Sequence, residues 1–291
     1  MPPRGQVRRR RDRRDSRLSS LFFAMKPLGL IAGNGQFPLL LADEARRQGR
    51  AVVAAAIEGE TDPVLAEKVD TLHWMKLGQI KRTIQILKDA GADEAVMAGQ
   101  VKHVSIFDLR HLDSTAVKIL ATLPNKKTDT ILGAVAAAFA KEGIRFLPST
   151  TYLSDRLAPE GPWTALRPNG DQKRDIEFGF RTAKAIAGLD LGQTVCVKDQ
   201  AVLAIEAMEG TDACIRRAGT FAQQFIVAKV AKPKQDIRFD VPVIGLRTLE
   251  SLKAAGAAVL AVEAGKTLLF DKDEFLKGAQ EANIVVVGVK A

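Results

Sequence analysis

Carboxylates and cations crowd into one short stretch of the chain, AKPKQDIRFDVPVIG, at residues 231–245. Asp236 and Asp240 offer hard oxygen ligands of the kind that Mg²⁺ prefers, and Arg238 stands between them. Three lysines add positive charge nearby: Lys229, Lys232 and Lys234. Cations can neutralise a diphosphate, and a positioned carboxylate can orient or deprotonate an attacking water. These residue types therefore favour a site for a diphosphate ester.

The arrangement of these charges depends on whether the stretch is extended or bent. If residues 236–240 are extended, Ile237 and Phe239 point to one face and the charged side chains to the other. In a straight strand, Asp236 and Asp240 lie ~13 Å apart at ~3.3 Å per residue, too far to share one Mg²⁺ at ~2.1 Å. Either the chain bends here or the two acids have different roles. The alternative is a solvated strand whose arginine pairs with its own aspartates.

A glycine turn separates the first apolar run from the first amphipathic stretch, in LGLIAGNGQFPLLLA. Gly33 and Gly35 let the backbone turn sharply and approach a ligand closely, and the free amides at a helix start favour an anion. The third glycine of the dinucleotide-binding pattern is absent, because Pro38 occupies its place. The turn predicts a phosphate or nucleotide site, with a purely structural turn as the alternative.

A second polar constellation lies in VKDQAVLAIEAMEGTDACIRR, residues 197–217. Asp199 and Gln200 form the tip of an expected hairpin. Thr211 or Asp212 could cap the following helix through its side-chain oxygen. Polar groups at both places predict one shared site, although capping alone would explain one of the two helix residues.

Strands and amphipathic helices alternate from Leu28 onward, which predicts β-α-β units and a parallel sheet, and hence an α/β protein. In the first half, the expected strands cover residues 28–32, 51–57, 69–75, 94–99 and 144–148, and the expected helices 36–49, 79–91, 107–123 and 129–142. In the second half, a hairpin at 194–207 and strands at 225–230, 258–265 and 284–289 are interleaved with helices at 174–187, after 211, and at 248–256 and 272–282.

This pattern divides the chain into four parts. Residues 1–24 form a disordered basic extension, residues 25–155 a Rossmann-like nucleotide-binding domain, residues 156–170 a linker or crossing loop rich in proline and glycine, and residues 171–291 an α/β or α+β domain that carries the charged stretch.

The net charge of +9 does not describe the folded part of the chain. Residues 1–24 hold eight arginines and two aspartates, a net +6, which leaves +3 for the other residues. This segment has no apolar core of a secretory signal, so we interpret it as disordered or as translated sequence upstream of the true start; an arginine arm for anionic lipid or nucleic acid is the alternative. No run of 18 apolar residues is present to span a membrane.

Several kinds of chemistry are disfavoured by what the sequence lacks. The three histidines, His73, His103 and His111, form none of the pairings of a zinc site, and no P-loop or G-x-S-x-G pattern occurs. A single tyrosine and few aromatics near the basic clusters offer no stacking platform, so we expect no nucleic-acid partner. Cys196 and Cys214 are expected to be buried thiols in a reducing cytoplasm.

Four blocks together resemble one family: GLIAGNGQFP, DQAVLAIEAMEGTDACIRRAG, AKPKQDIRFDVPVIG and LAVEAG. They are similar to the UDP-2,3-diacylglucosamine pyrophosphatases of lipid A biosynthesis, in their histidine-poor, magnesium-dependent form. The resemblance covers residues 25–291. It implies a Rossmann-like domain followed by a family-specific α/β (α+β) domain, with a lipid-linked UDP-sugar between them. It also implies hydrolysis to UMP and 2,3-diacylglucosamine 1-phosphate, with Mg²⁺ as cofactor and water directed to the phosphorus nearer the sugar.

The resemblance also assigns roles to particular positions. The catalytic strip would consist of Lys232, Gln235, Asp236, Arg238 and Asp240. We predict Asp236 and Asp240 as the metal site, and our hypothesis is that one carboxylate holds the ion and the other the water. The substrate-binding residues would be Gly33, Asn34, Gly35, Asp199, Gln200, Thr211 and Asp212. The acyl chains would lie along the apolar helices at residues 116–123 and 130–140, where core packing is the alternative use of any one side chain.

Two other functions stay open at this point. A nucleotide-sugar binding or regulatory protein would use the same domain without hydrolysis. An NAD(P)-dependent oxidoreductase would follow from the glycine turn, but the third glycine and a Tyr-x-x-x-Lys pair are missing. We expect a cytoplasmic location, free or at the inner-membrane surface through peripheral contact, and leave open whether the chain forms a homodimer.

Overall fold

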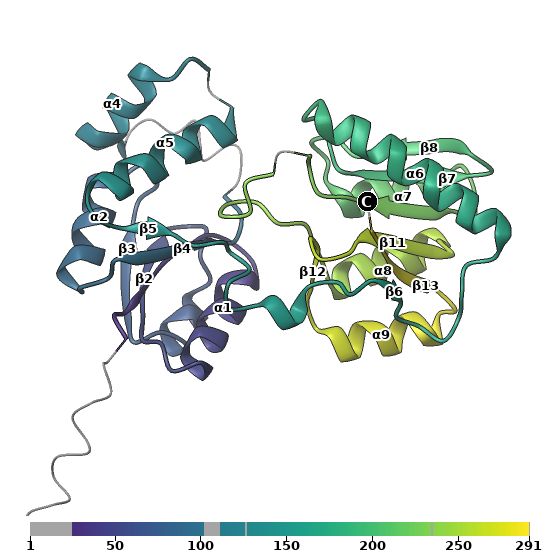
Figure 1. Cartoon of the computed structure of the whole chain (residues 1–291), viewed down its shortest axis with the longest axis horizontal. Coiled ribbons are helices and arrows are strands. Elements are labelled where there is room, and N and C mark those ends of the chain that lie inside the picture. The colour runs from purple at the N-terminus through teal and green to yellow at the C-terminus, as the bar shows by residue number, and fades with distance from the viewer. Residues whose placement is uncertain (1–24, 102–110, 126, 234, 291) are drawn as a thin grey trace, which may run out of the picture.

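The computed structural model describes residues 25–101, 111–125, 127–233 and 235–290. The expected basic extension, residues 1–24, lies outside them. Figure 1 shows two lobes, an N-terminal one coloured purple to teal and a C-terminal one coloured green to yellow. The chain passes once between the lobes along η3 (Ser154–Arg156), and a green loop reaches back from the second lobe toward the first.

The N-terminal lobe is built on a five-stranded sheet in the order β3-β2-β1-β4-β5, and every neighbouring pair is parallel. The alternating pattern of the sequence is therefore confirmed as a parallel sheet. Its elements are β1 (Leu28–Ala32), α1 (Phe37–Arg47), β2 (Val52–Ile57), η1 (Pro63–Glu67), β3 (Thr71–Met75), α2 (Ile80–Asp89), β4 (Glu94–Ala98), α4 (Ser114–Thr122), α5 (Thr128–Lys141) and β5 (Arg145–Phe146).

Helices cover both faces of this sheet. Leu30 is fully buried in a cluster with Leu41 of α1. Its neighbour Ile31 joins a second cluster with Leu87 of α2 and Phe139 of α5. Alternate residues of a strand point to opposite faces, so a strand buried on both sides needs the continuous apolar runs that the sequence contains.

The helix expected at residues 107–123 differs at its start. Residues 107–110 lie outside the described part of the chain, and α4 begins only at Ser114. The side chain of Asp113 accepts hydrogen bonds from the amides of Thr115 and Ala116, each at 3.0 Å, which fixes the helix start there.

The C-terminal lobe holds a mixed six-stranded sheet in the order β6-β13-β11-β9-β7-β8. Strands β9, β11 and β13 are parallel, whereas β6, β7 and β8 join antiparallel. Its elements are β6 (Gly161–Pro162), α6 (Gly170–Gly188), β7 (Thr194–Lys198), β8 (Ala201–Ile205), α7 (Thr211–Gly219), β9 (Ile226–Lys229), β10 (Val243–Ile244), α8 (Leu246–Ala255), β11 (Val259–Glu263), β12 (Leu268–Leu269), α9 (Lys272–Glu281) and β13 (Val285–Val289).

The segment predicted as a linker, residues 156–170, runs along the C-terminal lobe. β6 pairs with the strand β13, and Trp163 donates a backbone hydrogen bond to Val286 at 2.8 Å. Ala158 is buried in the main C-terminal core. Proline and glycine are acceptable in a short edge strand. The same residues that predict a loop are therefore compatible with the edge strand β6.

The two lobes share an apolar core. β10 and β12 form a separate parallel pair, and Leu268 and Phe270 belong to the same cluster as Leu28 of the N-terminal sheet. The ring of Phe270 meets that of Phe37 edge-on, with centroids 5.5 Å apart. Edge-to-face aromatic pairs of this kind stabilise a contact beyond the area they bury.

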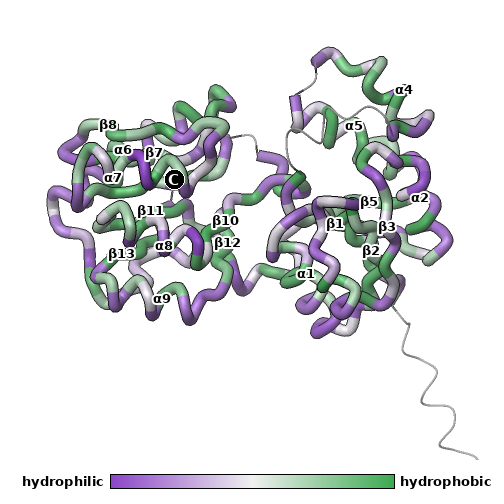
Figure 2. Tube along the Cα trace, turned by 180° about the vertical axis from the view of Figure 1, so that it is seen from behind, coloured by the Kyte–Doolittle hydropathy of each residue, from purple (hydrophilic) through white to green (hydrophobic). Residues whose placement is uncertain are grey.

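Figure 2 shows green segments running through both lobes, including the region of β2 and β11, and many purple connecting segments. Within the residues that the structure describes, no helix combines the length and apolarity that crossing a bilayer requires.

Candidate active site

The glycine turn lies at the carboxyl edge of the parallel sheet, where the strand order reverses between β1 and β4. Loops at such a switch point form the ligand sites of open α/β sheets. The loops after β1 and β4 are held together here, because Asn34 and Gln100 exchange backbone hydrogen bonds of 2.7 and 3.1 Å.

The structure explains why glycine occupies positions 33 and 35 of the turn. A Cβ on Gly33 would lie 2.6 Å from the backbone carbonyl oxygen of Gln100, so packing between the two loops excludes a side chain. Gly35 has a φ of +93° and open space around it. The helix α1 that follows has no side-chain cap at Gln36, so its first amides can still receive an anion, except at Pro38, which has none.

Residues 236–240 do not form a straight strand: the chain bends here, which is one of the two alternatives that the sequence left open. The amides of Phe239 and Asp240 both donate to the carbonyl of Asp236, at 3.0 and 3.1 Å, so the chain forms a helical turn. The Asp236 side chain also accepts the amide of Arg238 at 3.1 Å. Such local bonds compete with a sheet ladder. The 13 Å separation expected for a straight strand therefore does not apply.

The same turn seats the loop on the N-terminal lobe. Ile237 and Phe239 do not share a face: Ile237 is 48% exposed, whereas Phe239 packs against Phe146 with ring centroids 6.1 Å apart. The carbonyl of Ile237 accepts hydrogen bonds from the backbone and the hydroxyl of Ser149, at 2.9 and 2.8 Å. The charged loop that contains Asp236 and Asp240 thus lies at the junction of the two lobes, where Figure 1 shows it as a green loop.

Asp236 is held by its neighbour Arg238. The guanidinium donates to both carboxylate oxygens, with Nε to Oδ1 at 2.9 Å and Nη2 to Oδ2 at 2.6 Å. These hydrogen bonds lower the pKa of Asp236 and raise that of Arg238. The pairing that we considered as an alternative therefore occurs, and it involves Asp236.

Asp240 has a different electrostatic environment. Burial raises the pKa of its carboxyl group, and the cation of Lys232 opposes that shift. Asp129, in the first turn of α5, raises the pKa of Asp240 further through charge repulsion. Lys232 is itself anchored elsewhere, with its Nζ 2.6 Å from Asp190, and its amide donates to Gln235 at 2.7 Å. The two acids come from different lobes, and they are close enough for the charge of Asp129 to affect Asp240.

A buried lysine, Lys229, lies at the end of β9 and was not among the predicted site residues. The residue is 4% exposed, and its Nζ donates a hydrogen bond to the hydroxyl of Thr211 at 2.6 Å. That hydroxyl in turn donates to Glu206 at 2.8 Å. Burial lowers the pKa of Lys229, whereas Glu206, Asp212 and Asp240 raise it. A lysine inside an otherwise apolar strand was the sequence signal for this position.

Capping of α7 by Thr211 or Asp212 is also wrong. The residue at the cap position is Gly210, with a φ of 82°, and no side chain caps the helix. Thr211 bonds to the buried cluster instead, and Asp212 lies 3.9 Å from the highly exposed Arg247. Helix capping therefore does not explain why Thr211 and Asp212 are present at the start of α7.

The hairpin is confirmed, but its tip lies away from Thr211. Asp199 and Gln200 have φ of 50° and 58°, and their amides donate to the buried Asp175 of α6 at 3.0 and 2.7 Å. Thr211 contacts Thr194, at the other end of β7. Four residues of strand separate these ends by ~13 Å. The structure therefore does not bring the tip and the helix start into one site.

The tip should tolerate substitution. We expect the double variant Asp199→Asn and Gln200→Gly to raise the free energy of unfolding by about 1 kcal/mol, because Asn-Gly suits two successive residues with positive φ. Turnover should stay at the wild-type value, since the amides that bond to Asp175 are kept. Thermal unfolding and steady-state kinetics would check this. A large loss of kcat or a rise in KM would instead place the tip at the substrate.

In the part of the chain that the structure describes, Lys232, Gln235, Asp236, Arg238 and Asp240 thus lie in one loop, and the charges of Lys229 and Asp129 act on Asp240. In the described part of the chain, no group of three or more His, Cys, Asp or Glu side chains has the arrangement of a metal site.

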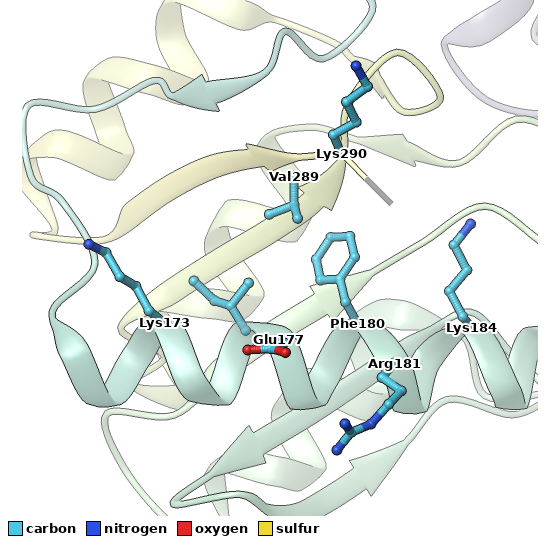
Figure 3. Close-up of a pocket in the computed structure, with 8 residues that line it drawn as sticks. Lys173, Glu177, Phe180, Arg181, Lys184, Val289 and Lys290 are labelled. Carbon is cyan, nitrogen blue, oxygen red and sulfur yellow. The ribbon is translucent and has the colours of Figure 1, made fainter.

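A groove of about 340 Å³ lies elsewhere, between α6 and the end of β13, and is lined by Ile176, Phe180, Lys184 and Val289 among others (Figure 3). Cys196 and Cys214 are fully buried free thiols, as expected.

Comparison with known proteins identifies the family. The model of the LpxI N-terminal domain matches residues 27–156, and that of the LpxI C-terminal domain matches residues 159–287. These two matches cover most of the chain, so the chain belongs to the LpxI family.

A curated relative supports the same assignment. The UDP-2,3-diacylglucosamine pyrophosphatase LpxI of Caulobacter vibrioides is 30% identical over 277 residues, which are 91% of this chain and 98% of the relative. Among solved structures, N5-carboxyaminoimidazole ribonucleotide synthetase from Thermotoga maritima matches at 17% identity over 64% of this chain and 42% of its own, with a TM-score of 0.24. The biotin carboxylase domain of a thermophilic 2-oxoglutarate carboxylase matches at 10% identity over 58% and 34%, with a TM-score of 0.26. The chain spans less than half of either structure, and neither bears on its fold.

Proposed function

We propose that this protein hydrolyses UDP-2,3-diacylglucosamine to UMP and 2,3-diacylglucosamine 1-phosphate. One observation carries the proposal beyond family membership. The strip 232–240 of the C-terminal lobe, with its acids and cations, is seated on the N-terminal lobe through Ser149 and Phe146. A diphosphate held at this junction would meet groups from both lobes.

The N-terminal lobe would bind the nucleotide half as a Rossmann-like domain. Its strand order is that of the first five strands of dinucleotide-binding sheets, and the turn at Gly33, Asn34 and Gly35 lies at the switch point. The uncapped start of α1 would face an anionic phosphate. On the C-terminal side, Thr211 and Asp212 would line the site through the cluster around Lys229.

Mg²⁺ is the cofactor that the acids fit best. Asp240 and Asp129 repel each other across the junction, and hard carboxylate oxygens of this kind bind Mg²⁺ together with substrate phosphates. These two residues would hold the ion, which would neutralise charge on the diphosphate. The metal-site role predicted for Asp236 fits less well, because both of its oxygens accept hydrogen bonds from Arg238.

The chain's own residues would carry out the proton transfer. Asp240 would orient a water molecule toward the phosphorus nearer the sugar and accept its proton as the new P–O bond forms. The bond from that phosphorus to the bridging oxygen breaks, and UMP leaves. Lys232 and Arg238 would stabilise the charge that develops on the phosphoryl oxygens, and Gln235 would fix the backbone of Lys232.

The acyl chains would lie against α4 and α5. Both helices are apolar in sequence, and Figure 2 shows green stretches along them at the outer end of the N-terminal lobe. Only Ala116 is buried in α4, and Val117 is 51% exposed. Apolar side chains left partly uncovered in this way suit an acyl chain. Peripheral contact with the inner-membrane surface and formation of a homodimer stay as predictions.

The test is a direct assay of the purified protein. We expect UMP release from UDP-2,3-diacylglucosamine in Mg²⁺, loss of release in EDTA, and recovery when Mg²⁺ is restored. In H₂¹⁸O the label should enter diacylglucosamine 1-phosphate, because water attacks the phosphorus nearer the sugar; label in UMP would refute that step. Substrate binding without any release of UMP would favour the nucleotide-sugar binding protein instead.

A further inference from the structure

A buried carboxylate, Glu263, ends the strand β11 and gathers donors from three elements. The residue is 1% exposed. Lys184 of α6 places Nζ 2.8 and 2.6 Å from its two oxygens, and Lys266 lies 2.9 Å from Oε1. The amide of Ala231 donates to Oε2 at 2.8 Å. The cluster thus joins a helix, a strand end and the first residues of the charged strip.

Both lysines keep Glu263 ionised. Burial alone raises the pKa of this carboxyl group, but the hydrogen bonds from Lys184, Lys266 and the amide of Ala231 outweigh burial, and the net shift is downward. Lys184 also donates to the carbonyl of Ala231 at 3.1 Å. Figure 3 shows Lys184 projecting from α6 toward the sheet, on the same side as Phe180.

The contact with Ala231 determines what this cluster can do. Ala231 is 3% exposed, and its amide and carbonyl both lie beyond the end of β9, where no sheet partner receives them. Glu263 and Lys184 satisfy the two groups, and Lys232 is the next residue. Because both the N–H and the C=O of Ala231 are hydrogen-bonded, its backbone has little conformational freedom. The position at which the chain enters the strip is therefore fixed relative to the sheet.

We infer that Glu263 and Lys184 are positioning residues, which set the conformation of residues 231–240 and so aim Lys232 and Asp240 at the diphosphate. The role rests on the proposed hydrolysis, and neither residue needs to touch the substrate. A pair that served stability alone could be replaced by apolar groups at little cost, because burying charges is expensive. The chain instead keeps this pair in contact with Ala231, the residue that precedes the strip.

A second ion pair supplies a matched control. Glu94 accepts Arg50 at 2.8 Å and Arg145 at 2.6 Å, so it too is a strand carboxylate bound by two cations. It begins β4, at the sheet edge opposite to the glycine turn. Glu94→Gln should therefore lower the melting temperature and leave kcat unchanged.

The decisive measurement is hydrogen exchange, which needs no activity. In Glu263→Gln we expect amide exchange in a peptide that covers residues 231–241 to quicken by about tenfold or more, while exchange in β7 and β8 stays unchanged. Kinetics should show kcat reduced by about 10–100-fold and KM changed by less than about threefold, as for other residues that orient catalytic groups. Lys184→Met should behave in the same way, and Lys184→Arg should recover much of the loss.

The two residues act on one backbone position, so the variants should not be additive. We expect Glu263→Gln combined with Lys184→Met to lose little more kcat than either variant alone. Exchange in residues 231–241 that stays at the wild-type rate in Glu263→Gln would overturn the inference. So would a loss of kcat in Glu94→Gln as large as that in Glu263→Gln. A wild-type protein with no UMP release, in contrast, would refute the proposed function and leave the exchange result intact.

Discussion

Asp240→Asn is expected to lower kcat by about 10³-fold, which is within the range for loss of a general base. The amide has nearly the same shape but cannot accept the proton of the attacking water, and it binds a divalent cation weakly. At saturating Mg²⁺ we expect the loss mainly in kcat, because Lys232, Arg238 and the glycine turn still bind the substrate, and we expect the variant to need more Mg²⁺ for half-maximal activity. Steady-state UMP release would measure the effect, with Asp93→Asn as the control, since Asp93 is an exposed partner of Lys26. Activity within about tenfold of wild type would remove Asp240 from the catalytic role.

The same variant should be at least as stable as the wild type at neutral pH. Burial raises the folded-state pKa of Asp240 above its unfolded value. The folded protein therefore binds more protons than the unfolded chain between these two pKa values, and the wild type loses stability as pH rises through that window. Asparagine does not titrate. We expect the melting temperature of Asp240→Asn, relative to wild type, to increase from acid to neutral pH and then to level off; a relative decrease would contradict the shift.

Gly33→Ala is expected to destabilise the fold by about 1–3 kcal/mol and to raise KM for the UDP-sugar. The new Cβ would lie 2.6 Å from the carbonyl oxygen of Gln100, and backbone cannot move aside as a flexible side chain can. The loops after β1 and β4 would separate at the proposed nucleotide site. Thermal unfolding and UMP binding by calorimetry would measure the two effects.

Gly133→Ala is the matched control for this change. Gly133 lies within α5, and a Cβ there meets nothing within 4 Å. Alanine should raise the free energy of unfolding by up to about 1 kcal/mol, because it suits a helix better than glycine. If Gly33→Ala were as stable as wild type and bound UMP equally well, the close packing of the two loops would not constrain the site.

Local patterns were enough to predict the parallel sheet and the hairpin at Asp199 and Gln200. Both depend on the spacing of apolar residues and on turn chemistry, which neighbouring residues determine. The sequence left open whether the chain bends at 236–240, because the bend depends on whether the side chain of Asp236 accepts hydrogen bonds from the nearby backbone or that backbone pairs with another strand. Alternation of charged and apolar residues looks the same in both cases.

The partners of the strip could not be found from local sequence. Asp129 precedes Asp240 by more than a hundred residues and reaches it only through the packing of the two lobes. Strand direction, which places Thr211 and the hairpin tip at opposite ends of β7, also needs the topology. One signal was present and was not used: Lys229 and Glu263 are charged residues inside apolar runs, where a charge is retained only with a partner.

The seat of the loop on Ser149 and Phe146 has a consequence for how this family can vary. The charged strip that would do most of the chemistry comes from the second half of the chain, whereas its support and the proposed metal ligand Asp129 come from the first half, so neither half would be active alone. In a chimera that joined the first half of one relative to the second half of another, we expect the loop to pack poorly against the first half. We therefore expect a substitution at Phe146 to require a compensating substitution at Phe239, because the two rings pack against each other.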